Sequence, residues 1–182
     1  MAAALVFFAG SAVLAWFSRK PLRRPGSHGF YRFFAWECIL GLAIVNHSPW
    51  GSATVSPHQL ASWALLAASV GLVAVGAATL IRRGGANAGR DDAALYHWEK
   101  TGALVTSGIF AYIRHPMYAS LLALTWGFFF QEPNWPAAAI AGLGSLLLFA
   151  TARQDERECL AHFGPAYAAY RQRTRMFVPW LF

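Results

Sequence analysis

The 182-residue sequence predicts an all-α integral membrane bundle with five transmembrane helices and a C-terminal cytosolic helical segment. Two observations predict this class. Hydrophobic residues make up 57% of the chain and charged residues only 13%, whereas soluble domains average about 45–50% and about 25%. Long apolar runs also recur along the chain, each close to the length that crosses a bilayer. The length fits a single domain.

The five expected spans follow one another in chain order. The first run is slightly short and apolar from its start, without the basic region of a signal peptide, so we retain it as a span. The third run is rich in small residues, which let helices pack closely in lipid. The short turn before the fifth predicts a tight antiparallel hairpin. The spans are residues 2–17, 30–47, 59–81, 109–130 and 136–151.

The chain therefore reads as one domain, 1–182. Its N-terminal part, 2–90, carries three helices, and its second part, 91–182, carries the hairpin and the C-terminal segment. Cys38 and Cys159 lie far apart, and no Cys/His spacing resembles a zinc site, so we expect neither a structural disulfide nor a metal.

The basic residues predict the orientation. Five spans would place all fifteen Lys and Arg on one side, because segments 48–58 and 131–135 contain none. The positive-inside rule makes that side cytoplasmic, so we expect the N-terminus outside and the C-terminus in the cytoplasm. The Ala-, Gly- and Arg-rich composition looks bacterial, so we expect a bacterial inner membrane as the location. Orientation and anionic headgroups then explain the net charge of +7 without nucleic acid as a partner.

The stretch "RHPMY", 114–118, interrupts the fourth apolar run. Proline removes a backbone donor and disfavours helix at the preceding residue, so we expect a break near His115 and a restart at Pro116. Irregular backbone at membrane depth is tolerated only against protein or a wet cavity. Alternatively, Arg114 and His115 merely mark the cytosolic start of the span, with Arg114 reaching the headgroups.

Further polar residues lie near this break or within spans. The hairpin should bring Asp155 and Glu156 beside Arg114, although a solvated charged turn is the simpler interpretation. Glu37 lies inside the second span, where an acid is a functional-site hypothesis, and we expect it to pair with Arg32 or another basic residue. Asn46, near the outer end, suits an interfacial role. The tyrosines around the motifs fit a membrane interface or a cation-binding site; they are Tyr112, Tyr118, Tyr167 and Tyr170.

Two spaced motifs resemble the isoprenylcysteine carboxyl methyltransferase family, which belongs with the phospholipid N-methyltransferases among small membrane methyltransferases. They are "LVTSGIFAYIRHPMY", 104–118, and "DERECLAHFGPAYAAYRQRTRMFVP", 155–179, and the resemblance covers roughly residues 95–182. Asp155 replaces the usual first glutamate of an acidic pair. The matching residues are Gly108, Phe110, Tyr112, Arg114, His115, Pro116, Tyr118, Asp155, Glu156, Phe163, Gly164, Tyr167 and Tyr170.

The resemblance implies S-adenosylmethionine as cofactor, bound on the cytosolic side under a capping C-terminal segment, and a hydrophobic methyl acceptor that enters from the lipid bilayer. Arg114 or Arg171 would orient an anionic acceptor, and Glu37 is a third catalytic candidate. Asp155 and Glu156 would face the amino-acid end of the cofactor. The expected cofactor-binding residues are Gly108, Tyr112, His115, Pro116, Tyr118, Asp155, Glu156 and Tyr167.

Other functions stay open at this stage. Membrane sterol and steroid reductases that use NADPH carry a similar Arg-His-Pro-Asn-Tyr run, but Met117 occupies the Asn place here. A non-enzymatic scaffold or transporter would explain the spans but not two polar motifs facing each other. For a methyltransferase, the acceptor is an isoprenylcysteine-like carboxylate, a lipid, or a small hydrophobic thiol, amine or carboxylate, and S-, N- and O-methylation are all open.

Overall fold

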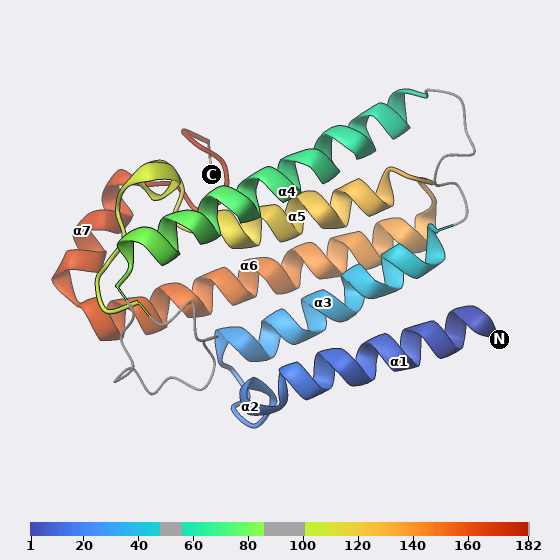
Figure 1. Cartoon of the computed structure of the whole chain (residues 1–182), viewed down its shortest axis with the longest axis horizontal. Coiled ribbons are helices and arrows are strands. Elements are labelled where there is room, and N and C mark those ends of the chain that lie inside the picture. The colour runs from blue at the N-terminus through green and yellow to red at the C-terminus, as the bar shows by residue number, and fades with distance from the viewer. Residues whose placement is uncertain (48–55, 86–100, 182) are drawn as a thin grey trace.

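The computed structural model describes residues 1–47, 56–85 and 101–181. The regular elements in this part of the chain are helices, and an isolated β-bridge joins Ile113 to Arg175. Five long helices run side by side, and α7 lies at one end of the bundle (Figure 1). The elements are α1 (Ala2–Phe17), α2 (Arg19–Leu22), α3 (His28–Val45), α4 (Pro57–Arg83), the 3-10 helix η2 (Gly108–Ala111), α5 (Pro116–Phe129), α6 (Trp135–Phe163) and α7 (Pro165–Arg173).

The bundle is built from two main helix pairs, α4 with α5 and α3 with α6, which the α5–α6 hairpin joins. The predicted hairpin is thus confirmed. Leu42 of α3 packs on Ala137 and Ala141 of α6, whose small side chains let the two helices approach closely. Helix α1 packs on α3 at the edge of the bundle and buries none of its own residues.

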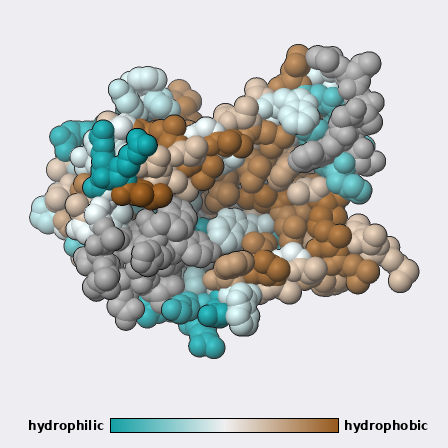
Figure 2. All heavy atoms as spheres, in the orientation of Figure 1, coloured by the Kyte–Doolittle hydropathy of each residue, from teal (hydrophilic) through white to brown (hydrophobic). Residues whose placement is uncertain are grey.

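The outer surface of the bundle is strongly apolar. Figure 2 shows hydrophobic side chains over the middle of the visible face and hydrophilic ones toward its ends. Large side chains such as Phe8, Val70 and Leu146 are more than half exposed. A water-soluble monomer rarely carries so much contiguous apolar surface, whereas a bilayer solvates it.

The expectation of five spanning helices is corrected by the helix lengths and compositions. Among the described residues, only α4 and α6 are long and apolar enough to cross a membrane by themselves. Helix α5 starts at Pro116 instead of residue 109, so its 14 residues reach about 21 Å, less than the roughly 30 Å of a hydrocarbon core. Helix α1 is short, and α3 carries Arg32 and Glu37 within its length.

Asn46 has a different role from the interfacial one predicted. It is fully buried at the C-cap of α3, and its amide nitrogen donates to the carbonyl oxygens of Phe128 (2.9 Å), Phe129 and Glu132 (3.3 Å each). The last carbonyls of a helix have no partner within it, so Asn46 satisfies the end of α5 from a neighbouring helix.

Replacing Asn46 with alanine is therefore expected to lower the free energy of unfolding by about 1–3 kcal/mol, because buried carbonyls lose their donor. Reversible denaturation in mixed micelles measures this loss. The exposed His47, whose ring bonds to a carbonyl of its own helix, provides the control His47→Ala. Equal effects of the two substitutions would contradict the capping role.

Candidate active site

The predicted break in the fourth apolar run is confirmed. Gly108 begins η2 with φ +64°, in the left-handed region that favours glycine. The chain leaves η2 at Tyr112, passes through an irregular stretch and restarts as α5 at Pro116, with His115 as the N-cap. Proline fits the first helical turn because an amide there has no helical partner to lose.

The C-terminal segment bonds to the backbone of this break. The amide of Arg114 donates to the carbonyl of Arg175 (2.7 Å), and the amide of His115 donates to that of Met176 (3.1 Å). In return, the amide of Arg175 donates to the carbonyl of Tyr112 (3.1 Å). The carbonyls of residues 175 and 176 therefore occupy two backbone amides of the break.

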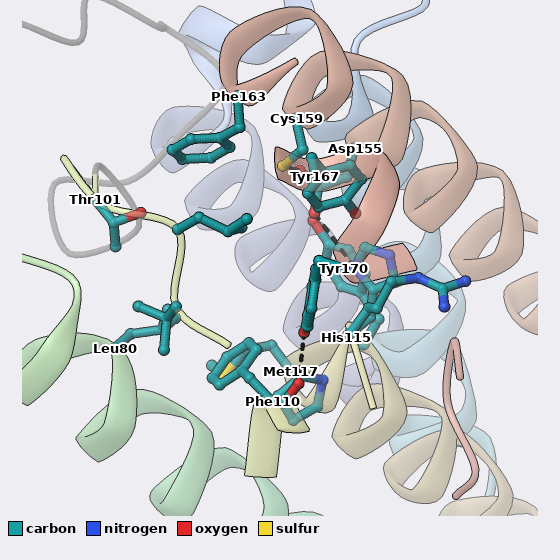
Figure 3. A pocket seen from close by; sticks show the side chains of 15 residues that line it. Leu80, Thr101, Phe110, His115, Met117, Asp155, Cys159, Phe163, Tyr167 and Tyr170 are labelled. Carbon is teal, nitrogen blue, oxygen red and sulfur yellow. Dashed lines mark hydrogen bonds and ion pairs between the residues drawn. The ribbon is translucent and has the colours of Figure 1, made fainter. Parts of the chain in front are cut away.

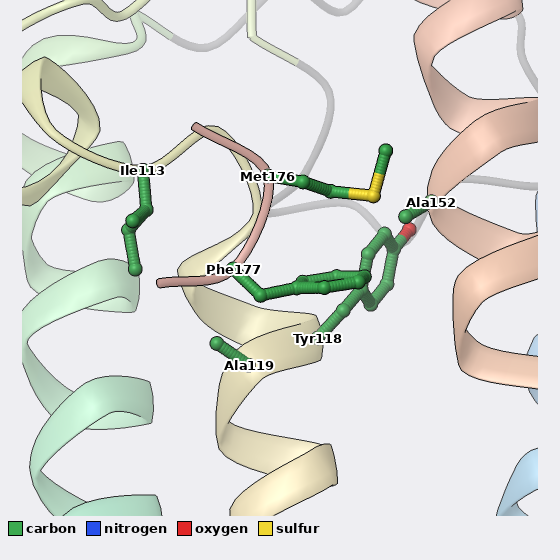
Figure 4. Packing of buried hydrophobic residues seen from close by; sticks show 6 residues of the cluster. All are labelled: Ile113, Tyr118, Ala119, Ala152, Met176 and Phe177. Atoms are coloured by element: carbon green, nitrogen blue, oxygen red, sulfur yellow. The ribbon is translucent and has the colours of Figure 1, made fainter. Parts of the chain in front are cut away.

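Side chains on both sides of this pairing form a small core. Met176 and Phe177 pack with Ile113 and Tyr118 and reach Ala152 of α6 (Figure 4). The tail after α7 is therefore anchored by backbone pairing and by burial, and it fixes the start of α5 relative to α6.

Arg114 lies at the centre of a buried polar junction. Its Nε donates to Glu156 Oε1 (2.8 Å), and its Nη2 lies 2.7 Å from the same oxygen. Its Nη1 donates to the carbonyl oxygens of Arg171 (3.2 Å) and Thr174. Only 2% of the Glu156 side chain is exposed. The predicted proximity of the acidic pair to the break is thus found, and Arg114 links α5, α6, α7 and the tail.

His115 lies between the two acids. Its Nδ1 is 3.5 Å from Asp155 Oδ2, and its Nε2 is 3.7 Å from Glu156 Oε1. The Nε2 atom is buried without a hydrogen-bond partner among the described residues. Its ring stacks on Tyr118, with centroids 5.4 Å apart and planes 22° apart.

A cavity of about 110 Å³ opens beside His115 and Asp155 (Figure 3). Six predicted residues line it, namely Arg114, His115, Pro116, Tyr118, Asp155 and Tyr167. Its other walls are mostly apolar or aromatic, from α4, the segment before η2, α5, α6 and α7. These additional lining residues are Leu80, Thr101, Leu104, Val105, Phe110, Met117, Cys159, Phe163 and Tyr170.

The sequence-based site prediction did not include these additional residues. Phe110, Phe163 and Tyr170 belong to the matched motifs, so the motif pattern could have identified them. Leu80 and Thr101 come from segments without a motif. The packing of α4 against η2 brings Leu80 to the cavity, and backbone bonds from Gly102 and Ala103 to the carbonyl of Gly84 hold the Thr101 segment there.

Two tyrosines of α7, Tyr167 and Tyr170, line the cavity as neutral side chains. Tyr170 donates its hydroxyl hydrogen to the carbonyl of Phe110 (2.7 Å), as the dashed line in Figure 3 shows. Tyr167 packs edge-on against it, with centroids 5.8 Å apart. Burial raises the pKa of both Tyr167 and Tyr170 far above the ordinary value, so both remain neutral phenols at physiological pH.

Five other predicted residues do not line this cavity, one of which is Glu156, the partner of Arg114. Gly108 lies against Thr79 of α4, and Tyr112 is 56% exposed and packs near Trp180. The Arg171 side chain is 43% exposed, with its Nε 3.8 Å from Glu156 Oε2. Glu37 was expected to pair with a basic residue, but its partner is the Ser11 hydroxyl of α1, which donates to it at 2.5 Å.

A second charged contact stands beside the cavity. The backbone amide of His28, at the start of α3, donates to Glu158 Oε1 (3.0 Å), and the His28 ring contacts the other oxygen of that carboxylate. Asp155 offers an oxygen within 4.8 Å of these groups. Glu158 thus satisfies an amide at the N-terminus of α3 and ties the first half of the chain to α6.

The pKa of His115 gives the site a pH dependence. Burial alone would lower this pKa, but the adjacent carboxylates of Asp155 and Glu156 outweigh it, so the pKa lies above the ordinary 6.5. A raised pKa means that the folded state holds the proton more tightly than the unfolded state. The resulting stabilisation is complete below about pH 6.5 and is lost as the pH rises through the raised value.

We therefore expect the melting temperature to fall as the pH rises above 6.5, and His115→Gln to flatten this fall. Thermal unfolding in detergent across that range measures it. His28 also has a raised pKa and contributes in the same direction, so the slope should not vanish. His162→Gln, at an exposed position on α6, is the matched control. An unchanged slope in His115→Gln would rule out this linkage.

Comparison with protein families matches residues 66–164, more than half of the chain, to the model of the phospholipid methyltransferases. The chain belongs to the phospholipid methyltransferase family. The matched range runs from α4 through the end of α6 and contains Arg114, His115, Asp155 and Glu156. The predicted membrane methyltransferase family is confirmed, and with the apolar helices α4 and α6 it indicates a membrane protein.

Three curated relatives resemble the chain. Cobalt-zinc-cadmium resistance protein CzcN of Cupriavidus metallidurans is 30% identical over 142 residues, 78% of this chain and 58% of that protein. Nickel-cobalt-cadmium resistance protein NccN of Alcaligenes xylosoxydans xylosoxydans is 28% identical over 154 residues, covering 82% and 65%. Methanethiol S-methyltransferase 1 of Bradyrhizobium diazoefficiens is 27% identical over 74 residues, covering 40% and 25%.

The chain thus spans less than two thirds of the length of each of these relatives. No solved structure matches it. The family and the methanethiol methyltransferase support methyl transfer as the class of reaction.

Proposed function

We propose that the chain transfers a methyl group from S-adenosylmethionine to a hydrophobic acceptor that reaches the site from the membrane. The observation that carries this proposal is the cavity at the cytosolic end of α5 and α6, where one carboxylate and several aromatic rings meet apolar walls. Membership of the phospholipid methyltransferase family supports the reaction class.

The residues present fit the charge of this cofactor. It carries an ammonium and a sulfonium, and Asp155 lines the cavity with a partly exposed carboxylate. Glu156 was predicted to share this role, but Arg114 occupies it. The neutral faces of Tyr167 and Tyr170 suit a cation. The Nε2 of His115 is a buried polar atom without a hydrogen-bond partner among the described residues, so a ligand group can bond to it.

When bound, the cofactor supplies an electrophilic methyl group on a positively charged sulfur. The chain's own contribution is alignment and exclusion of water. Phe110, Met117 and Phe163 form apolar walls, and Arg114 holds the start of α5 against α6 and the tail. Alignment of two reactants contributes up to roughly 7–11 kcal/mol in ideal cases, so a chain without a strong base in this cavity still has a route to catalysis.

The acceptor belongs to one of three classes, namely an isoprenylcysteine-like carboxylate, a lipid or a small hydrophobic molecule. The similarity to methanethiol S-methyltransferase 1 supports adding a small thiol to the compounds tested. For an anionic acceptor, Arg171 is the freer arginine, because its side chain is 43% exposed while that of Arg114 is 10% exposed.

We further propose that the bundle lies in a bacterial inner membrane, with the N-terminus outside and the C-terminus in the cytoplasm. Helices α4 and α6 would cross it, with α5 packed on both, α3 packed on α6 and α1 packed on α3. The distribution of Lys and Arg supports this orientation.

The test measures cofactor binding and methyl transfer separately. Purified protein in detergent is titrated with S-adenosylmethionine and with NADPH by calorimetry, and methyl-labelled cofactor is then incubated with protein and a native membrane extract. Binding of S-adenosylmethionine and label in a hydrophobic product support the proposal. Binding of NADPH alone would indicate a reductase, and binding of neither would favour a non-enzymatic membrane protein.

A further inference from the structure

A second cavity, of about 330 Å³, lies between the break, α4 and the C-terminal segment. It shares no lining residue with the methyl-transfer cavity. We call it the tail groove, because the C-terminal segment forms one of its walls. Leu72 of α4 and Ile109 of η2 face the tail across it. The other lining residues are Tyr112, Ile113, Phe177, Val178, Pro179 and Trp180. These walls are almost entirely apolar.

The tail groove follows α4 toward the apolar middle of the bundle. Leu72 lies eleven residues before Arg83, the last residue of α4, which corresponds to about 16 Å along the helix. The groove therefore extends from the polar end of the bundle to a depth at which a bilayer contains acyl chains. Helix α4 itself is one of the two helices apolar enough to span the membrane.

The tail beside the groove combines aromatic and basic side chains. Trp180 and Leu181 are 83% and 82% exposed. Arg173 and Arg175 are exposed, and neither forms an ion pair within the part of the chain that the structure describes. The Arg175 amide bonds to Tyr112, so this arginine lies at the groove wall. Exposed tryptophan beside arginine is typical of the headgroup level of a membrane.

We propose that the tail groove binds one acyl chain of an anionic phospholipid, whose phosphate pairs with Arg173 and Arg175. The apolar walls and their depth suit the chain, and the two unpaired cations complement the phosphate. The proposal rests on the membrane location but not on methyl transfer, and it treats this lipid as a bound partner of the tail.

Binding there has a consequence for the methyl-transfer cavity. Phe177 lines the groove and packs against His115, with ring centroids 6.2 Å apart. The same segment closes the break through the amides of Arg114 and His115. A lipid that holds the tail against α4 therefore stabilises the start of α5, so anionic lipid should raise the melting temperature even without cofactor.

The experiment uses the full chain in nanodiscs of phosphatidylcholine. One of two lipids with brominated acyl chains is added, either brominated phosphatidylglycerol or brominated phosphatidylcholine. Bromine quenches nearby tryptophan, and the difference between the wild type and Trp180→Phe isolates the signal of Trp180. We expect brominated phosphatidylglycerol to quench Trp180 at lower lipid fractions than brominated phosphatidylcholine. Arg173→Gln combined with Arg175→Gln should weaken this preference roughly thirtyfold, or about 2 kcal/mol for two basic side chains.

Two further variants make the result decisive. Leu72→Phe narrows the groove without changing charge, and it should reduce the quenching of Trp180 by either lipid. Arg153→Gln combined with Arg157→Gln removes two exposed charges from α6 and should leave the preference unchanged. Equal quenching by both lipids, or equal losses in the two arginine pairs, would overturn the proposal. Quenching that Leu72→Phe does not affect would also overturn it, because Trp180 would then contact bulk lipid.

Discussion

Replacing Glu156 with glutamine is expected to lower the free energy of unfolding by about 3–5 kcal/mol, because it leaves Arg114 as an uncompensated buried charge. Glu156 Oε1 accepts from Nε and lies 2.7 Å from Nη2 of that arginine, and only 2% of its side chain is exposed. Glutamine keeps the shape but presents no negative charge. The measurement is reversible denaturation in mixed micelles.

The loss should extend beyond one ion pair. Arg114 also donates to carbonyls of Arg171 and Thr174, so a displaced guanidinium releases the connection between α7 and the tail. Cysteine accessibility or proteolysis after residue 164 would report this release. In a double-mutant cycle, Arg114→Met with Glu156→Gln should cost less than the sum of the single changes, because the unpaired charge is gone.

Glu132→Gln is the matched control, since it removes a carboxylate at the exposed turn between α5 and α6. We expect a change within about 0.5 kcal/mol, as for most surface substitutions. A loss in Glu156→Gln no larger than in this control would show that the buried pair is not what holds the hairpin to the tail.

The helix boundaries show what sequence reasoning recovers. Proline chemistry predicted the restart of α5 at Pro116, because a missing amide and a restricted preceding residue are local effects. Hydropathy alone extended that span back to residue 109, since Ile109, Phe110 and Ile113 are as apolar as a membrane helix. Ile109 and Ile113 instead line the tail groove and pack in one hydrophobic cluster, and Phe110 lines the methyl-transfer cavity. No local pattern specifies these environments.

The polar residues show where sequence reasoning stops. The proximity of Asp155 and Glu156 to the break followed from the hairpin, but the division of roles between them did not. That division depends on which acid faces Arg114, a matter of helix rotation and of carbonyls in the tail. Asn46 and Glu37 were assigned by depth in the membrane, whereas their partners, the end of α5 and Ser11, lie on neighbouring helices.

Replacing Asp155 with asparagine is expected to weaken binding of S-adenosylmethionine roughly 10- to 150-fold, the range for losing one charged hydrogen bond of about 1.5–3 kcal/mol. Asp155 is the acid that lines the cavity, and its side chain is 18% exposed, whereas Glu156 is engaged by Arg114. Calorimetric titration of the variant gives the dissociation constant, and labelled methyl transfer gives KM and kcat.

The two acids should separate in this assay because they act on different partners. Asp155→Asn should mainly raise KM for the cofactor and change the melting temperature little. Glu156→Gln should mainly lower the melting temperature and change KM little. Glu132→Gln, at the far end of α5, should leave both unchanged. If Asp155→Asn binds the cofactor normally while Glu156→Gln remains stable but loses binding, the cofactor's ammonium faces Glu156 and Arg114 must move when the cofactor binds.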